Sequence, residues 1–118
     1  MKKQLDPIMY IVVRRDLNMP AGKMAAQVGH AVGRLLKDAS YEVLADYWNV
    51  DKGNEAKIVL GCADLDELIA IEAVCHKEIV RCELITDAGH TVFNEPTVTC
   101  LGIGPIYRYD DAHLFKHL

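Results

Sequence analysis

One lysine in this sequence occupies a position that suits chemistry better than it suits stability. Lys23 falls within the first turn of an expected helix, where unpaired amide groups and the helix dipole favour anions over cations. A lysine there can bind phosphate, stabilise a developing oxyanion or pair with a carboxylate from another segment. Lys23 is therefore a candidate functional residue.

A second candidate group surrounds Asp87, which directly follows an apolar, strand-like segment. Gly89 permits the positive φ that a tight turn often needs, and Thr91 and Thr99 supply hydroxyl groups nearby. The same Asp-Ala-Gly sequence is also what a purely structural turn would contain, because Asp and Gly are common in turns. We expect the Lys23 ammonium and the Asp87 carboxylate to share one water-accessible hollow.

The helix expected over residues 20–37 has three faces at 100° per residue. The polar face is either a solvated surface or a functional one, and its His30 titrates near neutral pH. The face consists of Lys23, Gln27, His30, Arg34 and Lys37. An apolar face consists of Met24, Val28, Ala31 and Leu35, and a face of very small residues of Gly22, Ala26, Gly29 and Gly33. The small residues predict the close approach of another backbone or a partner, or else tight packing of the helix on a sheet.

The elements that position these groups alternate between strands and helices. Short apolar runs predict strands over residues 8–13, 56–62, 79–86 and 98–103, the last closed by Gly104-Pro105. Helices are expected over residues 20–37, 41–48 and 64–77, the last with Asp64 and Glu67 as a capping-box-like start. This alternation favours an α/β domain with helices on both faces of a small, mostly parallel sheet of four strands. Sites in such sheets form at strand ends, here the loop over residues 14–19 and the segment after residue 87.

Composition excludes several classes of protein. A chain of 118 residues with 51% apolar residues can build one core, so we expect a single domain over residues 1–118. No apolar run is long enough to cross a membrane, and the four cysteines lie singly, as expected for buried thiols of a soluble cytoplasmic protein. A net charge of −4 argues against a protein that coats nucleic acid non-specifically, but it permits a local basic patch.

Three separated motifs carry a family resemblance. They are VVRRDLNMPAGKMAAQVGHA over residues 12–31, ITDAGHT over residues 85–91 and EPTVTCLGIGP over residues 95–105. In this order they strongly resemble the type 2 peptidyl-tRNA hydrolase family, and the resemblance covers nearly all of residues 8–105. It implies hydrolysis of the ester that joins a peptide to the 3′ ribose of tRNA, which recycles tRNA from stalled translation.

The resemblance also implies the fold, the partners and the site. The family fold is a three-layer α/β/α sandwich on a four-stranded mixed sheet with one strand antiparallel. Members commonly form homodimers, and no metal or other cofactor belongs to the site. The functional positions that match are Arg14, Asp16, Lys23, Gln27, His30, Asp87, Thr91 and Thr99.

We expect a mechanism without a covalent intermediate, because no serine or cysteine lies in a triad-like setting. Asp87 would position or deprotonate water, and Lys23 would stabilise the oxyanion or keep Asp87 ionised. Thr91 and Thr99 would donate hydrogen bonds, and His30 would either donate a proton or contact RNA. Phosphate contacts are expected from Arg14, Arg15, Lys23, Arg34 and Lys37.

Two alternatives and two departures accompany this hypothesis. The chain could be a non-catalytic module that binds RNA or a protein on the same fold, or a hydrolase of another acyl conjugate. The resemblance places Gly61 where relatives often carry a basic residue, and the net charge of −4 is unusual for an enzyme that acts on tRNA. His113 and His117 have the spacing of helical metal ligands, but at the chain end we expect a surface tail.

Overall fold

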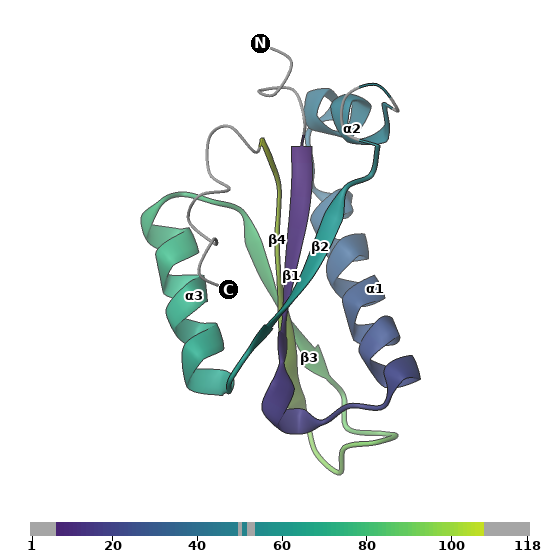
Figure 1. Cartoon of the computed structure of the whole chain (residues 1–118), viewed down its shortest axis with the longest axis vertical. Coiled ribbons are helices and arrows are strands. Elements are labelled where there is room, and N and C mark those ends of the chain that lie inside the picture. Colours follow the sequence, from purple (N-terminus) through teal and green to yellow (C-terminus); the bar gives the residue numbers. More distant parts are fainter. Residues whose placement is uncertain (1–6, 50, 52–53, 108–118) are drawn as a thin grey trace.

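The computed structural model describes residues 7–49, 51 and 54–107, and the tail with His113 and His117 lies outside them. This part of the chain forms four strands and three α-helices (Figure 1). In chain order the elements are β1 (Pro7–Arg14), the 3-10 turn η2 (Arg15–Leu17), α1 (Ala21–Lys37), α2 (Tyr41–Trp48), β2 (Lys57–Cys62), α3 (Leu65–Lys77), β3 (Cys82–Asp87) and β4 (Thr97–Tyr107). The expected α/β class is confirmed.

The strands form one mixed sheet in the order β2-β1-β4-β3. β1 pairs parallel with β2, whereas β4 runs antiparallel to both of its neighbours, β1 and β3. Three of the four strands therefore run in the same direction and β4 alone is reversed, as expected for a mixed, mostly parallel sheet with one antiparallel strand. The reason is local: no helix separates β3 from β4, and strands that are joined without a crossover pair antiparallel.

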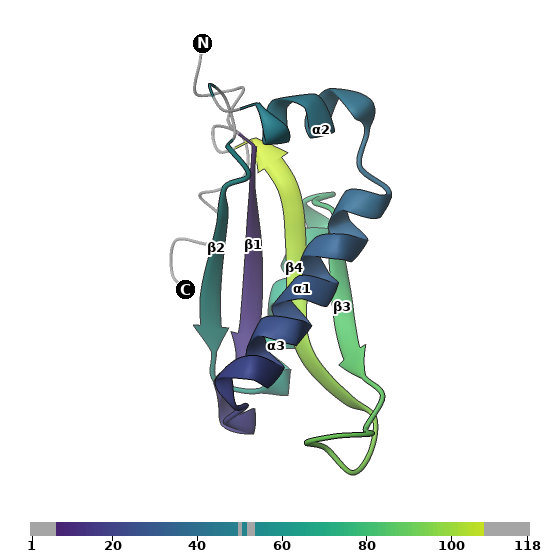
Figure 2. The same cartoon turned by 90° about the vertical axis from the view of Figure 1, so that its right-hand side faces the viewer.

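The central strand β1 is buried on both faces, as its apolar run predicts. Val12 packs in the core on one face, together with Leu68 of α3. Its neighbour Ile11 packs in the core on the opposite face, with Leu35 of α1 and Tyr47 of α2. Figures 1 and 2 show α3 and α1 on opposite sides of the sheet. The sheet therefore fixes the site-bearing helix α1 from one side.

Local residues mark the three helix starts, although the sequence leaves open whether residues 38–40 continue the first helix or begin a new one. α1 starts directly after Pro20, and the Ser40 hydroxyl accepts a hydrogen bond from the Val43 N–H at 3.2 Å, which makes α2 a separate helix. The Asp64 side chain accepts from the Glu67 N–H at 3.0 Å, as the capping-box-like start of α3 predicts. Local side-chain chemistry thus sets these helix starts.

Two strand boundaries differ from the expected ones by more than one residue. β3 begins three residues late, because Ile79 adopts a left-handed φ of 57° in the turn that follows α3. β4 continues to Tyr107 instead of closing at Gly104-Pro105. A register irregularity in the β1–β4 pairing lets the proline stay in a central strand.

All four cysteines are free thiols, and three of them are buried, as expected. Cys82 is half-buried. Within residues 7–49 and 54–107, no helix has the length and apolar character needed to span a membrane.

Candidate active site

Lys23 and Asp87 meet at the end of the sheet where α1 begins and β3 ends. The Lys23 Nζ atom lies 2.5 Å from Asp87 Oδ1 and donates a second hydrogen bond to Thr91 Oγ1 at 2.8 Å. Only 12% and 11% of the lysine and aspartate side chains are exposed, so the pair is largely shielded but open to water. The expected meeting of these two groups is confirmed.

A tight turn after β3 fixes the orientation of Asp87. The Gly89 N–H donates to Asp87 Oδ2 at 2.9 Å, and Gly89 adopts a φ of +86°. A Cβ atom at this position would lie 2.5 Å from the backbone carbon of Glu95. Only glycine combines this φ with this close backbone approach, so the turn holds the carboxylate against α1.

Two buried polar side chains support the pair from behind. Gln27 Nε2 donates to Asp87 Oδ1 at 3.3 Å, and Gln27 Oε1 accepts from Thr99 Oγ1 at 2.6 Å. The side chains are nearly or fully buried, Gln27 with 2% and Thr99 with 0% exposed. The resemblance implied direct functional roles for both, but Thr99 reaches Asp87 only through Gln27.

Neighbouring charges keep Asp87 ionised. The hydrogen bond from Lys23, followed by that from the Gly89 N–H, holds the pKa of the Asp87 carboxyl below its ordinary value, and the charge of His90 acts in the same direction. The Phe93 ring centroid lies 5.7 Å from Lys23 Nζ. Sequence reasoning missed both His90 and Phe93. The first was visible as a titratable group within the DAGHT turn, whereas nothing in the sequence pointed to the second.

The turn after β1 contains two arginines with different partners. Arg14 forms a two-pronged ion pair with Asp16, at 2.7 and 3.1 Å, and donates to the Val98 carbonyl at 2.9 Å. This pairing raises the pKa of Arg14 and lowers that of Asp16. Arg15 is exposed, and no described residue pairs with its guanidinium. Arg14 and Asp16 therefore brace the turn, while Arg15 is the available cation.

The remaining predicted residues on α1 are not brought to the Lys23–Asp87 pair. His30, Arg34 and Lys37 are exposed, and by helix geometry they lie about 10, 16 and 21 Å along the axis from Lys23. No described hydrogen bond links any of these three side chains to Asp87. The polar face is thus divided: its first turns enter the site and its last turns face solvent.

The face of small residues lies open. A Cβ atom added at Gly22, Gly29 or Gly33 would meet nothing within 4 Å. Tight packing of this face on the sheet, and close approach of another part of the described chain, are therefore both wrong. The apolar residues of α1 pack on the sheet from a different side of the helix.

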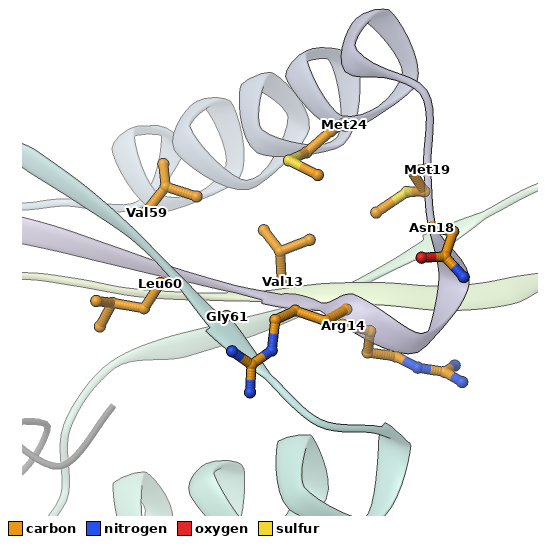
Figure 3. Close-up of a pocket in the computed structure, with 9 residues that line it drawn as sticks. Val13, Arg14, Asn18, Met19, Met24, Val59, Leu60 and Gly61 are labelled. Atoms are coloured by element: carbon orange, nitrogen blue, oxygen red, sulfur yellow. The ribbon is translucent and has the colours of Figure 1, made fainter.

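Two hollows adjoin the same end of the sheet. One, of about 530 Å³, lies between α1 and β2, and Figure 3 shows Val13, Met24 and Val59 around it. The other, of about 720 Å³, is bordered by Arg14 and by Phe93, the residue that also contacts Lys23. Substrate segments could therefore approach the pair from two sides.

Comparison with known proteins identifies the family of this chain. The model of the family described as "Peptidyl-tRNA hydrolase PTH2" matches residues 8–118. The chain is 40% identical to the peptidyl-tRNA hydrolase of Methanopyrus kandleri over 96 residues, covering 80% of this chain and 81% of that protein. It is 38% identical to the peptidyl-tRNA hydrolase of Thermoplasma acidophilum over 99 residues, covering 82% and 83%. The chain therefore belongs to the PTH2 family of peptidyl-tRNA hydrolases.

Proposed function

We propose that this chain hydrolyses the ester bond between a peptide and the 3′ ribose of tRNA and so returns tRNA to translation. The observation that carries the proposal is the Lys23–Asp87 pair, held at 2.5 Å in a chain whose relatives are named peptidyl-tRNA hydrolases. Ester hydrolysis needs an activated water, donors for the oxyanion and a proton for the departing ribose oxygen.

Asp87 is the group that holds the attacking water. A carboxylate can accept roughly four hydrogen bonds. Lys23 and Gln27 donate to Oδ1, and the Gly89 N–H donates to Oδ2, which leaves room for one further donor. A water in that place would give up its proton to Asp87 as it attacks the ester carbon directly, without a covalent intermediate.

Lys23 supplies the charge that stabilises the oxyanion. Its ammonium has three donors, of which Asp87 and Thr91 accept two. The third is available for the oxygen on which negative charge develops. Thr91, at the exposed edge of the pair, holds the ammonium in this direction.

The proton for the ribose oxygen is assigned to His90, an exposed imidazole three residues after Asp87 in the same turn. His30, about 10 Å along α1 from Lys23, is assigned to RNA contact instead. Gln27 and Thr99 are positioning residues for Asp87. Arg15, Arg34 and Lys37 are exposed cations that would meet phosphates, so affinity for tRNA should fall as salt rises.

The remaining expectations are carried forward as proposals. We infer a three-layer α/β/α sandwich, supported by separate cores under α3 and under α1 with α2. We also infer that residues 1–118 form a single domain that acts in the cytoplasm, where translation supplies its substrate and where free thiols persist. The homodimer implied by the family is testable by sedimentation.

The decisive experiment follows release of the peptide from N-acetylaminoacyl-tRNA by variants Lys23→Met and Asp87→Asn. Matched controls are Lys77→Met and Asp66→Asn, exposed residues of α3. We expect the two site variants to lose about 100-fold or more in kcat and the controls to keep full activity. Full turnover in either site variant would refute the assigned roles. A wild-type protein that binds tRNA without releasing peptide would be a binding module instead.

A further inference from the structure

The hollow between α1 and β2 exists because α1 does not cover the edge of the sheet. α1 lies against β4, β3 and β1, and the side of β2 that faces α1 stays open. Apolar side chains are exposed there: Val59 of β2 with 49% and Met24 of α1 with 36% of their surface. Val13 and Met19, both buried, complete the apolar floor of the hollow (Figure 3).

A glycine at the end of β2 places a cation beside this floor. A Cβ atom at Gly61 would lie 2.8 Å from Arg15 Cδ and 2.9 Å from Arg15 Cγ. Only a residue without a side chain lets Arg15 lie across the strand end. The basic group at this strand end therefore comes from η2, the turn that follows β1. Unlike Arg14, Arg15 is exposed and has no acidic partner among the described residues.

The hollow is next to the reaction centre. Met24, in its lining, follows Lys23 directly on α1, and consecutive helical residues point about 100° apart. The two sides of one helical turn therefore face the Lys23–Asp87 pair and the hollow. A group joined to the reacting ester can reach the hollow without passing around the molecule.

We propose that the hollow binds the 3′-terminal nucleotide of the tRNA acceptor end, with the base on the apolar floor and the phosphodiester against Arg15. This inference rests on the proposed function. Two groups flank the ester, a peptide and a nucleotide, and only the nucleotide carries an obligatory negative charge for the unpaired guanidinium. Unstacked bases of single-stranded ends are commonly held on apolar or guanidinium surfaces.

The lining suits a planar base. Met19 and Met24 contribute flexible, polarisable thioethers that adapt to a ring. The Asn18 amide stands at the rim, with one N–H directed to the Asp16 carbonyl at 3.5 Å. Its oxygen can accept from the exocyclic amine of an adenine. The hollow thus offers an apolar surface, an acceptor and a cation.

Binding can be measured without catalysis by titrating the trinucleotide CpCpA into protein with ¹³C-methyl methionine and recording methyl NMR shifts. We expect the Met19 and Met24 methyls to shift, while Met9, which is fully buried in the core, stays unchanged as an internal control. Arg15→Leu should raise the Kd for CpCpA about tenfold, and Arg15→Lys should restore most of the affinity. Gly61→Val should act like Arg15→Leu, because it displaces the arginine. Lys77→Leu, which removes an exposed cation of α3, is the matched control.

The outcomes separate the two proposals. The inference would be overturned if N-acetylated amino acid amides shift the Met19 and Met24 methyl signals and CpCpA does not. The hollow would then be assigned to the peptide. Equal CpCpA affinity in Arg15→Leu and wild type would also overturn it. If CpCpA binds as expected but peptidyl-tRNA is not hydrolysed, the nucleotide site stands and the proposed catalysis fails.

Discussion

Thr99→Val tests the buried side chains behind Asp87 by removing a single hydroxyl. Thr99 is fully buried, and its Oγ1 lies 2.6 Å from Gln27 Oε1 and 3.3 Å from the Ile85 carbonyl. One proton serves one acceptor at a time, and the shorter bond goes to Gln27. Valine leaves that amide oxygen buried without a partner, which costs about 1–3 kcal/mol of unfolding free energy. The melting temperature should fall by about 4 °C per kcal/mol.

The same substitution should slow turnover through Gln27. In the wild-type protein, Gln27 Nε2 donates to Asp87 Oδ1 at 3.3 Å. When Oε1 has no partner, the amide can rotate and lose this hydrogen bond. Loss of one hydrogen bond to a charged carboxylate, worth about 1.5–3 kcal/mol, corresponds to a kcat about 10- to 150-fold lower. KM should not change, because Thr99 does not reach the surface that substrate contacts.

Urea unfolding and steady-state release of peptide from N-acetylaminoacyl-tRNA measure both effects. Thr99→Ser keeps the hydroxyl and should restore kcat. Thr97→Val is the matched control on the same strand, since the Thr97 hydroxyl bonds only the nearby Glu95 carbonyl at 2.8 Å. A Thr99→Val protein with wild-type kcat would refute the positioning role. A Thr99→Ser protein as slow as Thr99→Val would show that packing of the methyl group matters instead of the hydroxyl.

Two further predictions concern packing and thiol chemistry. Gly29→Ala places a methyl group in open space in the middle of α1 and should stabilise the protein by about 0.5–1 kcal/mol. In Gly102→Ala the new Cβ atom would lie 3.1 Å from Ala31 Cβ, and this variant should be less stable by about 1 kcal/mol or more. Urea unfolding measures both changes. Equal midpoints would contradict this contrast. A hydrogen bond from Cys75 lowers the pKa of Cys82 to about 7, so its alkylation by iodoacetamide, followed by mass spectrometry, should be half-maximal near pH 7 and level off above about pH 8. A rate that is still rising steeply above about pH 8 would contradict it.

The helices and strands could be predicted from the sequence because helix capping and apolar runs depend on residues that are close together in the chain. Pro20, Ser40 and Asp64 mark the helix starts through backbone geometry and capping bonds that involve only near neighbours. The direction of β4 could not be taken from its own residues, since a buried apolar strand looks alike in both directions. The missing helix between β3 and β4 was the signal that did carry this information.

The sequence predicted the charged residues of the candidate site, but it did not predict which of the polar residues around them are buried. Lys23 and Asp87 could be singled out because one is electrostatically misplaced and the other ends a strand. Gln27 lies on the same helical face as Lys23, and only packing distinguishes the exposed stripe from the buried part that starts with Gln27. Gly29 was expected in a closely packed face, but a Cβ atom there would meet open space. A small residue in a helix is compatible with both situations, so the sequence does not distinguish them.

The ammonium of Lys23 lies at the start of α1, where the helix dipole disfavours a cation. Its pairing with Asp87 relates this unfavourable position to the proposed function. The helix N-terminus favours an anion, and β3 brings one from a position 64 residues away in the sequence. Asp87 therefore compensates Lys23, and Lys23 with the Gly89 N–H keeps Asp87 ionised. A carboxylate alone would suit the helix start, so stability does not call for the ammonium. The proposed hydrolysis, in which negative charge develops beside the ammonium, would account for its presence.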